Sequence, residues 1–337
     1  MAECAIRVKD LRKEYPSRSG TVHAVSGIDL EIKQGECFGL LGPNGAGKTT
    51  TVEILEGLNQ PTSGEVEVLG LEWQTDEVAI RERIGVTLQE TRFPDKETVR
   101  EIITLFRSFY KRGMNPDDVI ERVELESKAR TFIEQLSGGQ KQRLAVALAL
   151  VGDPEVLFLD EPTTGLDPQS RRQLWDVIRD LRDRGRTIVL TTHYMDEAER
   201  LCDRVAIIDH GKIIAQGSPV ELIARLGGDH IIEFALELSG AAAKQEADSF
   251  LGLDSVLAAR IENDGYSLTV AQPHRAIPAL LDELDQRQLP LIRLTTRHVS
   301  LEDVFVSLTG RHLRDDETKE GPDAANAGGR KNRWKRA

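Results

Sequence analysis

Residues Gly42 to Thr49 have the sequence Gly-Pro-Asn-Gly-Ala-Gly-Lys-Thr and directly follow a short apolar run, Cys37–Leu41. This octapeptide matches the glycine-rich loop that binds phosphate, in which backbone N–H groups close around phosphate oxygens. The apolar run is typical of a buried strand. The pattern therefore predicts a strand, the loop and a helix that begins near Lys48, with the positive end of the helix dipole facing the anion.

The side chains of this loop predict how a nucleoside triphosphate binds. We expect the Lys48 ammonium to hold the β- and γ-phosphates of ATP, and the Thr49 hydroxyl to ligate Mg²⁺. The other residues here that we expect to bind the nucleotide are Gly42, Pro43, Asn44, Gly45, Ala46, Gly47 and Thr50.

Two further apolar runs end in residues that suit the same site. Val156–Leu159 leads into Asp160 and Glu161, and Thr187–Thr191 leads to His193. The carboxyl ends of parallel strands meet at one sheet edge, so Asp160 is expected to hold Mg²⁺ through water. Glu161, on the other side of the pleat, is expected to polarise the attacking water, as general base or by orienting it. His193 can donate a hydrogen bond to phosphate. The alternatives are a solvated acidic turn and a structural histidine.

The spacing of apolar residues predicts an α/β fold in which helices wrap a parallel sheet. Helical spacing over Val99–Tyr110, Asp117–Leu125 and Gln140–Leu150 predicts a helical subdomain at about residues 92–150. We expect it to be inserted between halves of a sheet domain that covers residues 1–228.

A different pattern follows, which predicts a small α+β domain at residues 229–310. Asn263, Asp264 and Gly265 indicate a hairpin turn between two of its strands. The predicted order β-α-β-β-α-β is that of ferredoxin-like folds. Its predicted elements are His230–Leu236, Ala241–Phe250, Ser255–Ile261, Tyr266–Ala271, Arg275–Arg287 and Leu291–Thr295.

Composition limits where the chain works and what it binds. The longest apolar stretch, Leu144–Val151, is much shorter than the roughly 18 residues that span a bilayer, and no export signal is evident, so we expect a cytoplasmic protein. The cysteines at positions 4, 37 and 202 have no metal-binding spacing and are expected to be incidental. A formal net charge of -12 argues against nucleic acid as a partner. Residues 311–337 are basic at their end and predict a solvated, disordered tail; contact with anionic lipid is the alternative.

A second anion site is predicted at the start of the helix near residue 140. Ser137 is suited to cap this helix, and the following glycines leave its first N–H groups open. A helix start that is merely capped is the alternative. The predicted site consists of Ser137, Gly138, Gly139 and Gln140, and together with Leu136 they form a five-residue motif. These five residues resemble the signature motif of the ABC ATPase family, and the phosphate loop and acidic strand occur in that family's order.

The resemblance covers roughly Ile6 to Leu222 and implies roles for further residues. Gln89 resembles the family's catalytic glutamine, which links Mg²⁺ and the attacking water to the helical subdomain. Tyr15 resembles the aromatic residue that stacks on adenine, and His193 the switch histidine that contacts the γ-phosphate. Gly165–Asp167 resembles the loop that reads the partner subunit's site.

The family resemblance also implies an activity. It implies an ATPase that forms a homodimer, with two ATP molecules each sandwiched between one subunit's phosphate loop and the other's signature motif. It further implies attachment to the cytoplasmic face of the membrane through an integral membrane permease, gripped by the region of Arg92, Phe93 and Pro94. Ser300–Phe305 resembles the end of daunorubicin-resistance-type exporter ATPases, which implies export of a drug-like, antibiotic or lipid-like substrate.

Other classes of function remain open. ABC ATPases also act in DNA repair and translation, and other transporters move different cargo or work in the opposite direction. Repair and chromosome members typically place a long insertion between the two motifs, and translation factors carry two cassettes, whereas this chain has one. A P-loop kinase or GTPase would have no use for the signature motif.

Overall fold

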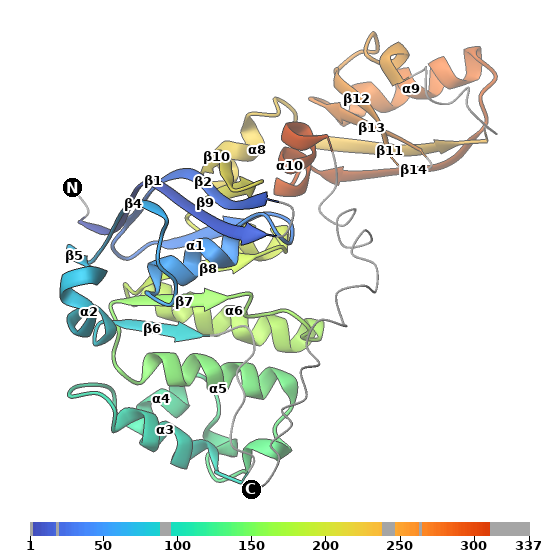
Figure 1. Cartoon of the computed structure of the whole chain (residues 1–337). Coiled ribbons are helices and arrows are strands. Elements are labelled where there is room, and N and C mark those ends of the chain that lie inside the picture. Colours follow the sequence, from blue (N-terminus) through green and yellow to red (C-terminus); the bar gives the residue numbers. More distant parts are fainter. Residues whose placement is uncertain (1–2, 18–19, 88–95, 238–246, 263–264, 311–337) are drawn as a thin grey trace, which may run out of the picture.

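The computed structural model describes residues 3–17, 20–87, 96–237, 247–262 and 265–310 (Figure 1). Its centre is a six-stranded sheet in the order β10-β9-β3-β8-β7-β6. The strands from β9 to β6 are parallel, and β10 is antiparallel to β9. The strands of this sheet are β3 (Cys37–Leu41), β6 (Ile84–Thr87), β7 (Val156–Asp160), β8 (Thr187–Thr192), β9 (Arg204–Asp209) and β10 (Lys212–Gly217).

The three central strands β3, β7 and β8 are buried at every residue. This explains their uninterrupted apolar sequences, because a parallel sheet has both faces covered. One face is covered by α1 (Lys48–Leu55) and by a second, antiparallel sheet in the order β2-β1-β4-β5. The strands of that sheet are β1 (Cys4–Ser17), β2 (Gly20–Lys33), β4 (Ser63–Val68) and β5 (Leu71–Glu72), and α2 (Trp73–Arg81) follows them.

The opposite face of the central sheet is covered by most of the helices, as Figure 1 shows. Between β6 and β7 the chain forms α3 (Val99–Arg107), α4 (Pro116–Arg122) and α5 (Gly138–Leu150), which confirms the inserted helical segment with somewhat shorter helices than predicted. Helix α5 packs on α3 and α4 and also on β6. The remaining helices of this face are α6 (Pro168–Asp183), α7 (Met195–Leu201) and α8 (Pro219–Ala224).

The C-terminal part forms a separate antiparallel sheet in the order β12-β13-β11-β14, with its own core beneath α9. Most of the predicted helix Ala241–Phe250 lies outside the described residues. Only its end, Ala247–Phe250, is described, and it forms a short 3₁₀ turn. The ferredoxin-like assignment therefore stays a prediction. The elements are β11 (His230–Leu236), β12 (Val256–Glu262), β13 (Gly265–Val270), α9 (Pro273–Gln286), β14 (Leu291–His298) and α10 (Leu301–Thr309).

Helix α10 lies within the predicted small domain at residues 229–310 but does not pack only on its sheet. It packs on α7 and α8 of the first domain, and Leu301, Val304 and Phe305 are buried in that domain's core. The apolar side of this helix is thus satisfied by the larger core rather than by its own sheet. None of the helices that the structure describes is long and apolar enough to cross a bilayer.

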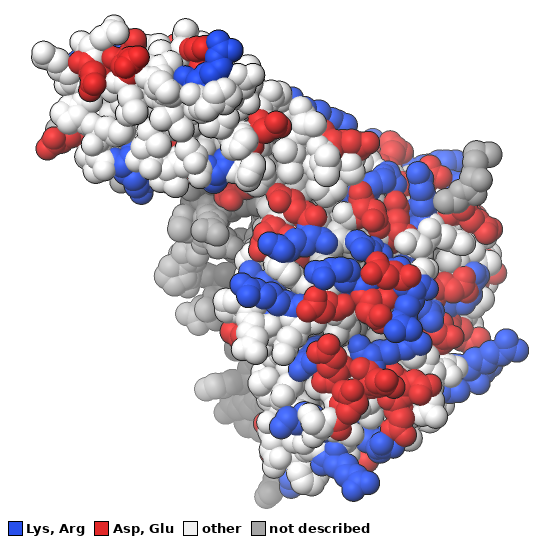
Figure 2. Space-filling model, turned by 180° about the vertical axis from the view of Figure 1, so that it is seen from behind, with Lys and Arg blue, Asp and Glu red and all other residues white. Residues whose placement is uncertain are grey.

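Charged side chains are interspersed over the face seen from behind in Figure 2. Acidic and basic residues alternate over the larger domain, whereas the small domain shows fewer charges in this view. Exposed ion pairs of this kind contribute little to stability individually.

Candidate functional site

The phosphate loop has a backbone that only glycine fits at two positions. Gly42 has φ 153°, and a Cβ there would lie 2.1 Å from the carbonyl oxygen of Ile208. Gly47 has φ 103°, and its Cβ would lie 2.3 Å from the carbonyl oxygen of Ala24. Gly47 is also the N-cap of α1 and supplies no side-chain cap, so the first-turn N–H groups stay open for an anion. The predicted start at Lys48 is confirmed.

The ammonium of Lys48 is almost completely buried at the base of this loop. It donates hydrogen bonds to the carbonyl oxygens of Gly42 and Pro43, at 2.8 and 3.1 Å. It also lies 3.9 Å from the carboxylate of Glu161. Burial lowers the pKa of Lys48, and the nearby carboxylates of Glu161 and Asp160 oppose this change. The cation is therefore already in place where phosphates would displace its carbonyl partners.

Asp160 and Glu161 diverge at the end of β7. Asp160 is buried and accepts a hydrogen bond from the Thr191 hydroxyl. Burial raises the pKa of Asp160, while the bond from Thr191 opposes the rise. Glu161 leaves the strand in the left-handed region with φ 44°, and its N–H donates to the carbonyl and hydroxyl oxygens of Thr191. A sharp turn, rather than the predicted continuation of the pleat, thus aims Glu161 into the site.

The carboxylate of Glu161 lies between a lysine and a histidine. Its Oε2 is 3.3 Å from Nδ1 of His193 and accepts a hydrogen bond from the Thr164 hydroxyl at 3.1 Å. The attraction to His193 is the main reason that the pKa of Glu161 lies below its ordinary value, although burial opposes it. Nδ1 of His193 is buried, yet within the described residues it has no well-aligned hydrogen-bond partner. The structure therefore brings Lys48, Glu161 and His193 together, as predicted.

A cavity of about 710 Å³ opens above these residues, a size that accommodates a nucleotide. Thr49 and Thr50 line it from α1, beside Asn44, Gly45 and Gly47 of the loop. The described residues include no group of three or more His, Cys, Asp and Glu side chains arranged to hold a metal. The Thr49 hydroxyl and the buried carboxylate of Asp160 still fit Mg²⁺, because this ion keeps several waters and phosphate oxygens among its ligands.

Tyr15 is not among the residues that line this cavity. Its hydroxyl accepts a hydrogen bond from Asn59 at 2.6 Å, and the Lys13 ammonium lies 5.0 Å from its ring centroid. The cavity wall is instead formed by Val22, which pairs opposite Tyr15, and by His23. Val22 is 52% exposed, and only the structure reveals that this exposed side chain lines the cavity. Stacking of Tyr15 on adenine stays a prediction.

The signature residues form the start of α5, away from this cavity. Ser137 Oγ accepts from the Gln140 N–H at 3.3 Å, and Gln140 Oε1 accepts from the Ser137 N–H at 3.0 Å, which is a capping box. The predicted cap is confirmed. Because the backbone N–H of Gln140 is donated to Ser137 Oγ, the N–H groups of Gly138 and Gly139 are the donors left for an anion. A Cβ at Gly139 would lie 2.5 Å from Ser170 Oγ, so this position also requires a small residue.

The loop at Gly165–Asp167 leads directly into α6. Asp167 is the N-cap of that helix and accepts hydrogen bonds from the N–H groups of Gln169 and Ser170, both at 3.0 Å. Gln89, the contact region at Arg92, Phe93 and Pro94, and residues 311–337 lie outside the described residues.

Comparison with known proteins agrees with this geometry. A family model described as ABC transporter matches residues 25–164. The Nod factor export ATP-binding protein I of Ralstonia nicotianae is 39% identical over 318 residues, covering 92% of this chain and 95% of that protein. The protein of the same name from Paraburkholderia xenovorans is 41% identical over 325 residues, covering 94% and 100%.

Two solved structures are similar to the larger domain. One is a dimeric, post-hydrolysis state of the ATP-binding cassette MJ0796 bound to ADP and Pi, with a TM-score of 0.58, 29% identity and coverage of 63% of this chain and 98% of that one. The other is cbiO1 from Clostridium perfringens, part of the ABC transporter complex cbiONQ, with a TM-score of 0.58, 30% identity and coverage of 66% and 91%.

Proposed function

This chain belongs to the ABC transporter ATP-binding protein family and is an ATPase, and we propose that it energises export of a drug-like, antibiotic or lipid-like substrate through a separate membrane permease. The proposal that the transporter works in the direction of export rests on the similarity to Nod factor export proteins over 92% of the chain. The resemblance of Ser300–Phe305 to daunorubicin-resistance-type ATPases supports the class of cargo.

In the proposed reaction, Lys48 exchanges its two carbonyl acceptors for oxygens of the β- and γ-phosphates. Thr49 and Asp160 would hold Mg²⁺, which neutralises phosphate charge when bound, and Gln89 would complete this set. The pKa of Glu161 lies below its ordinary value, so the carboxylate is ionised at neutral pH and orients or deprotonates the attacking water. His193 donates to the γ-phosphate. The turn at Glu161 supports this division of roles, because it separates its carboxylate from that of Asp160.

We further propose that two copies close head to tail around two ATP molecules. The open N–H groups of Gly138 and Gly139 would receive the γ-phosphate held by the partner's loop. MJ0796 is dimeric in its ADP-bound and Pi-bound state, which supports this arrangement. Cleavage of the γ-phosphate removes the shared anion, so each hydrolysis loosens the dimer and resets the transporter.

Coupling to a permease on the cytoplasmic face of the membrane is the part of the proposal that most needs a test. The full chain should copurify with an integral membrane protein after mild solubilisation of the native membrane, and export substrates should stimulate ATP hydrolysis by the complex. Phe93→Asp should abolish copurification. Phe109→Asp is a matched control, since Phe109 is 69% exposed within the helical segment but lies outside the predicted contact.

The outcomes separate the candidate functions. Copurification with a permease but stimulation by imported compounds would overturn the direction and keep the transporter. Association with nucleic acid or ribosomes, and with no membrane protein, would replace transport by a repair or translation role.

A further inference from the structure

A carboxyl group of α7, that of Glu197, is fully buried beside the candidate nucleotide site. Glu197 has 0% exposure, and its Oε1 accepts a hydrogen bond from the Trp175 indole N–H at 2.9 Å. Its Oε2 and the Thr163 hydroxyl are also buried, and neither has a well-aligned partner in the described part of the chain. Burying a carboxyl with incomplete hydrogen bonding is costly, so an apolar residue would satisfy packing alone more cheaply.

The neighbours of Glu197 come from three segments that form the site. Thr163 follows Glu161 by two residues, and Thr192 immediately precedes His193. Trp175 lies on α6, whose N-cap is Asp167. Burial raises the pKa of Glu197, and the nearby Thr192, Trp175, Thr163 and Arg171 oppose that rise. The Thr192 hydroxyl also accepts from the Tyr194 N–H at 2.9 Å and so shapes the turn that carries His193.

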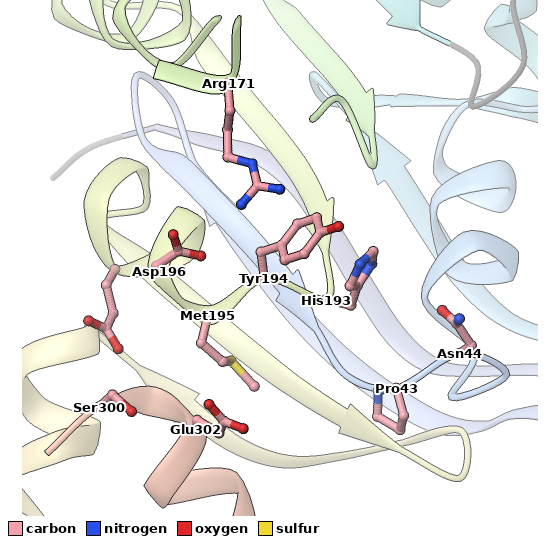
Figure 3. Close-up of a pocket in the computed structure, with 10 residues that line it drawn as sticks. Pro43, Asn44, Arg171, His193, Tyr194, Met195, Asp196, Ser300 and Glu302 are labelled. Atoms are coloured by element: carbon pink, nitrogen blue, oxygen red, sulfur yellow. The ribbon is translucent and has the colours of Figure 1, made fainter. Parts of the chain in front are cut away.

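Helix α6 touches the same turn at a second point. The guanidinium of Arg171, one helical turn before Trp175, lies 4.2 Å from the centroid of the Tyr194 ring. That ring is in turn 4.0 Å from the imidazole of His193, centroid to centroid. Figure 3 shows Arg171 reaching from α6 toward Tyr194, with His193 beside it and Asn44 of the phosphate loop beyond. Helix α6 therefore contacts the segment that follows His193 at two points, Tyr194 and Glu197.

We propose that Glu197 is a positioning residue that acts through His193. By holding Trp175, it fixes α7 against α6 and keeps the imidazole at the phosphate side of the cavity, 3.3 Å from Glu161. Because Asp167 is the N-cap of α6, the contact between Trp175 and Glu197 also couples the Gly165–Asp167 loop to His193. A misplacement of about 1 Å can slow a reaction on the order of 100-fold, so this contact is expected to matter for rate more than for binding. The inference rests on the proposed role of His193 in ATP hydrolysis.

The test compares Glu197→Leu, which removes the acceptor, with Glu197→Gln, which keeps an oxygen for Trp175. In the full-length chain we expect Glu197→Leu to lower kcat about tenfold with KM for ATP within twofold of wild type. Glu197→Gln should retain at least half of kcat, and Trp175→Phe should match Glu197→Leu. Asp196→Asn is the control, since Asp196 is an exposed neighbour on the same helix, and should leave both constants within twofold. Should Glu197→Leu not fold, Trp175→Phe carries the test.

The double variant with His193→Ala separates this inference from the function on which it rests. If His193→Ala hydrolyses ATP at the wild-type rate, the proposed role of His193 fails. If His193→Ala is slow, single-turnover hydrolysis of radiolabelled ATP should be no slower after Glu197→Leu is added. A wild-type kcat for the Glu197→Leu single variant would overturn the positioning role. So would a further tenfold loss in the double variant, because Glu197 would then act independently of His193.

Discussion

The ammonium of Lys48 lies 3.9 Å from the Glu161 carboxylate while it donates to the carbonyl oxygens of Gly42 and Pro43. The loop thus folds over its own lysine, and the buried positive charge is balanced by carbonyl dipoles and by the nearby carboxylates of Glu161 and Asp160. Phosphate oxygens are stronger acceptors than carbonyl oxygens for an ammonium group. If Lys48 binds phosphate as proposed, nucleotide binding would exchange its partners at a preformed position rather than order a free side chain.

Lys48→Ala is expected to weaken ATP binding by about 30- to 150-fold, the equivalent of losing charge-assisted hydrogen bonds worth about 2–3 kcal/mol. Titration with a fluorescent ATP analogue measures this loss. Lys33→Ala removes an exposed lysine and should bind ATP as the wild type does. An affinity within threefold of wild type in Lys48→Ala would show that the loop backbone alone holds the phosphates.

Glu161→Gln is expected to slow hydrolysis at least about 100-fold, because the side chain loses the charge that orients or deprotonates water. ATP binding should persist, since Lys48 and the loop are unchanged. The variant should then accumulate as an ATP-bound dimer, seen as a doubled mass in light scattering when ATP is added. Unimpaired phosphate release would remove Glu161 from its proposed role.

Those features of the site that depend on only a few neighbouring residues could be predicted from the sequence. The start of α1 at Lys48 and the cap at Ser137 follow from glycine geometry and from capping chemistry within a few residues. The left-handed turn at Glu161 was missed, because it depends on a bond to Thr191 of the neighbouring strand. The Trp175–Glu197 contact and the packing of α10 on the first domain are likewise long-range pairings that no periodicity within one segment encodes.

The same limitation applies to Tyr15. Its resemblance to the family's stacking aromatic residue predicts an adenine contact, which stays a prediction, while Val22 and His23 of β2 line the cavity. The register of β1 against β2 contains several shifts, and it places Val22 opposite Tyr15. Such register shifts depend on the pairing of two strands, so the sequence motif alone could not assign the cavity wall.

Glu56 gives the chain a pH-dependent stability. Burial, followed by the negative charges of Asp160 and Glu53, raises the pKa of Glu56 to about 8, and its Oε1 is buried without a hydrogen-bond partner among the described residues. The folded state therefore holds this proton between about pH 4.5 and 8, whereas the unfolded chain releases it, so stability falls as the pH rises through that window. The loss is expected to be on the order of 4–5 kcal/mol by pH 8.5.

Glu56→Gln should remove this part of the pH dependence and make the protein more stable than wild type at pH 8.5. Urea unfolding at pH 5.5, 7 and 8.5 measures the effect, and the two proteins should differ least at the lowest pH. Glu121→Gln changes an exposed carboxyl and should keep the wild-type slope. An unchanged slope in Glu56→Gln would mean that Glu56 is ionised in the folded protein.

The attachment of α10 to the small sheet depends on a partly buried ion pair. Arg297 on β14 donates two hydrogen bonds to Asp303, at 2.7 and 2.9 Å, and the side chain of Asp303 is 5% exposed. Burial raises the pKa of Asp303, but the bonds from Arg297 and Ser300 outweigh this and hold it below its ordinary value. Its stabilising contribution is thus present above the ordinary carboxyl pKa and lost as the pH falls through the lowered one.

Asp303→Asn leaves Arg297 without its charged partner and is expected to destabilise the docking of the small domain by about 2–3 kcal/mol. Hydrogen exchange of α10 should become about 30- to 150-fold faster where it proceeds by this undocking, while ATP binding at the loop stays unchanged. Asp254→Asn breaks the pair with Arg275 in the same domain, in which both side chains are at least half exposed. That control should cost less than about 1 kcal/mol. Equal effects of the two variants would show that burial adds nothing to the Arg297–Asp303 pair and that α10 is held mainly by Leu301, Val304 and Phe305.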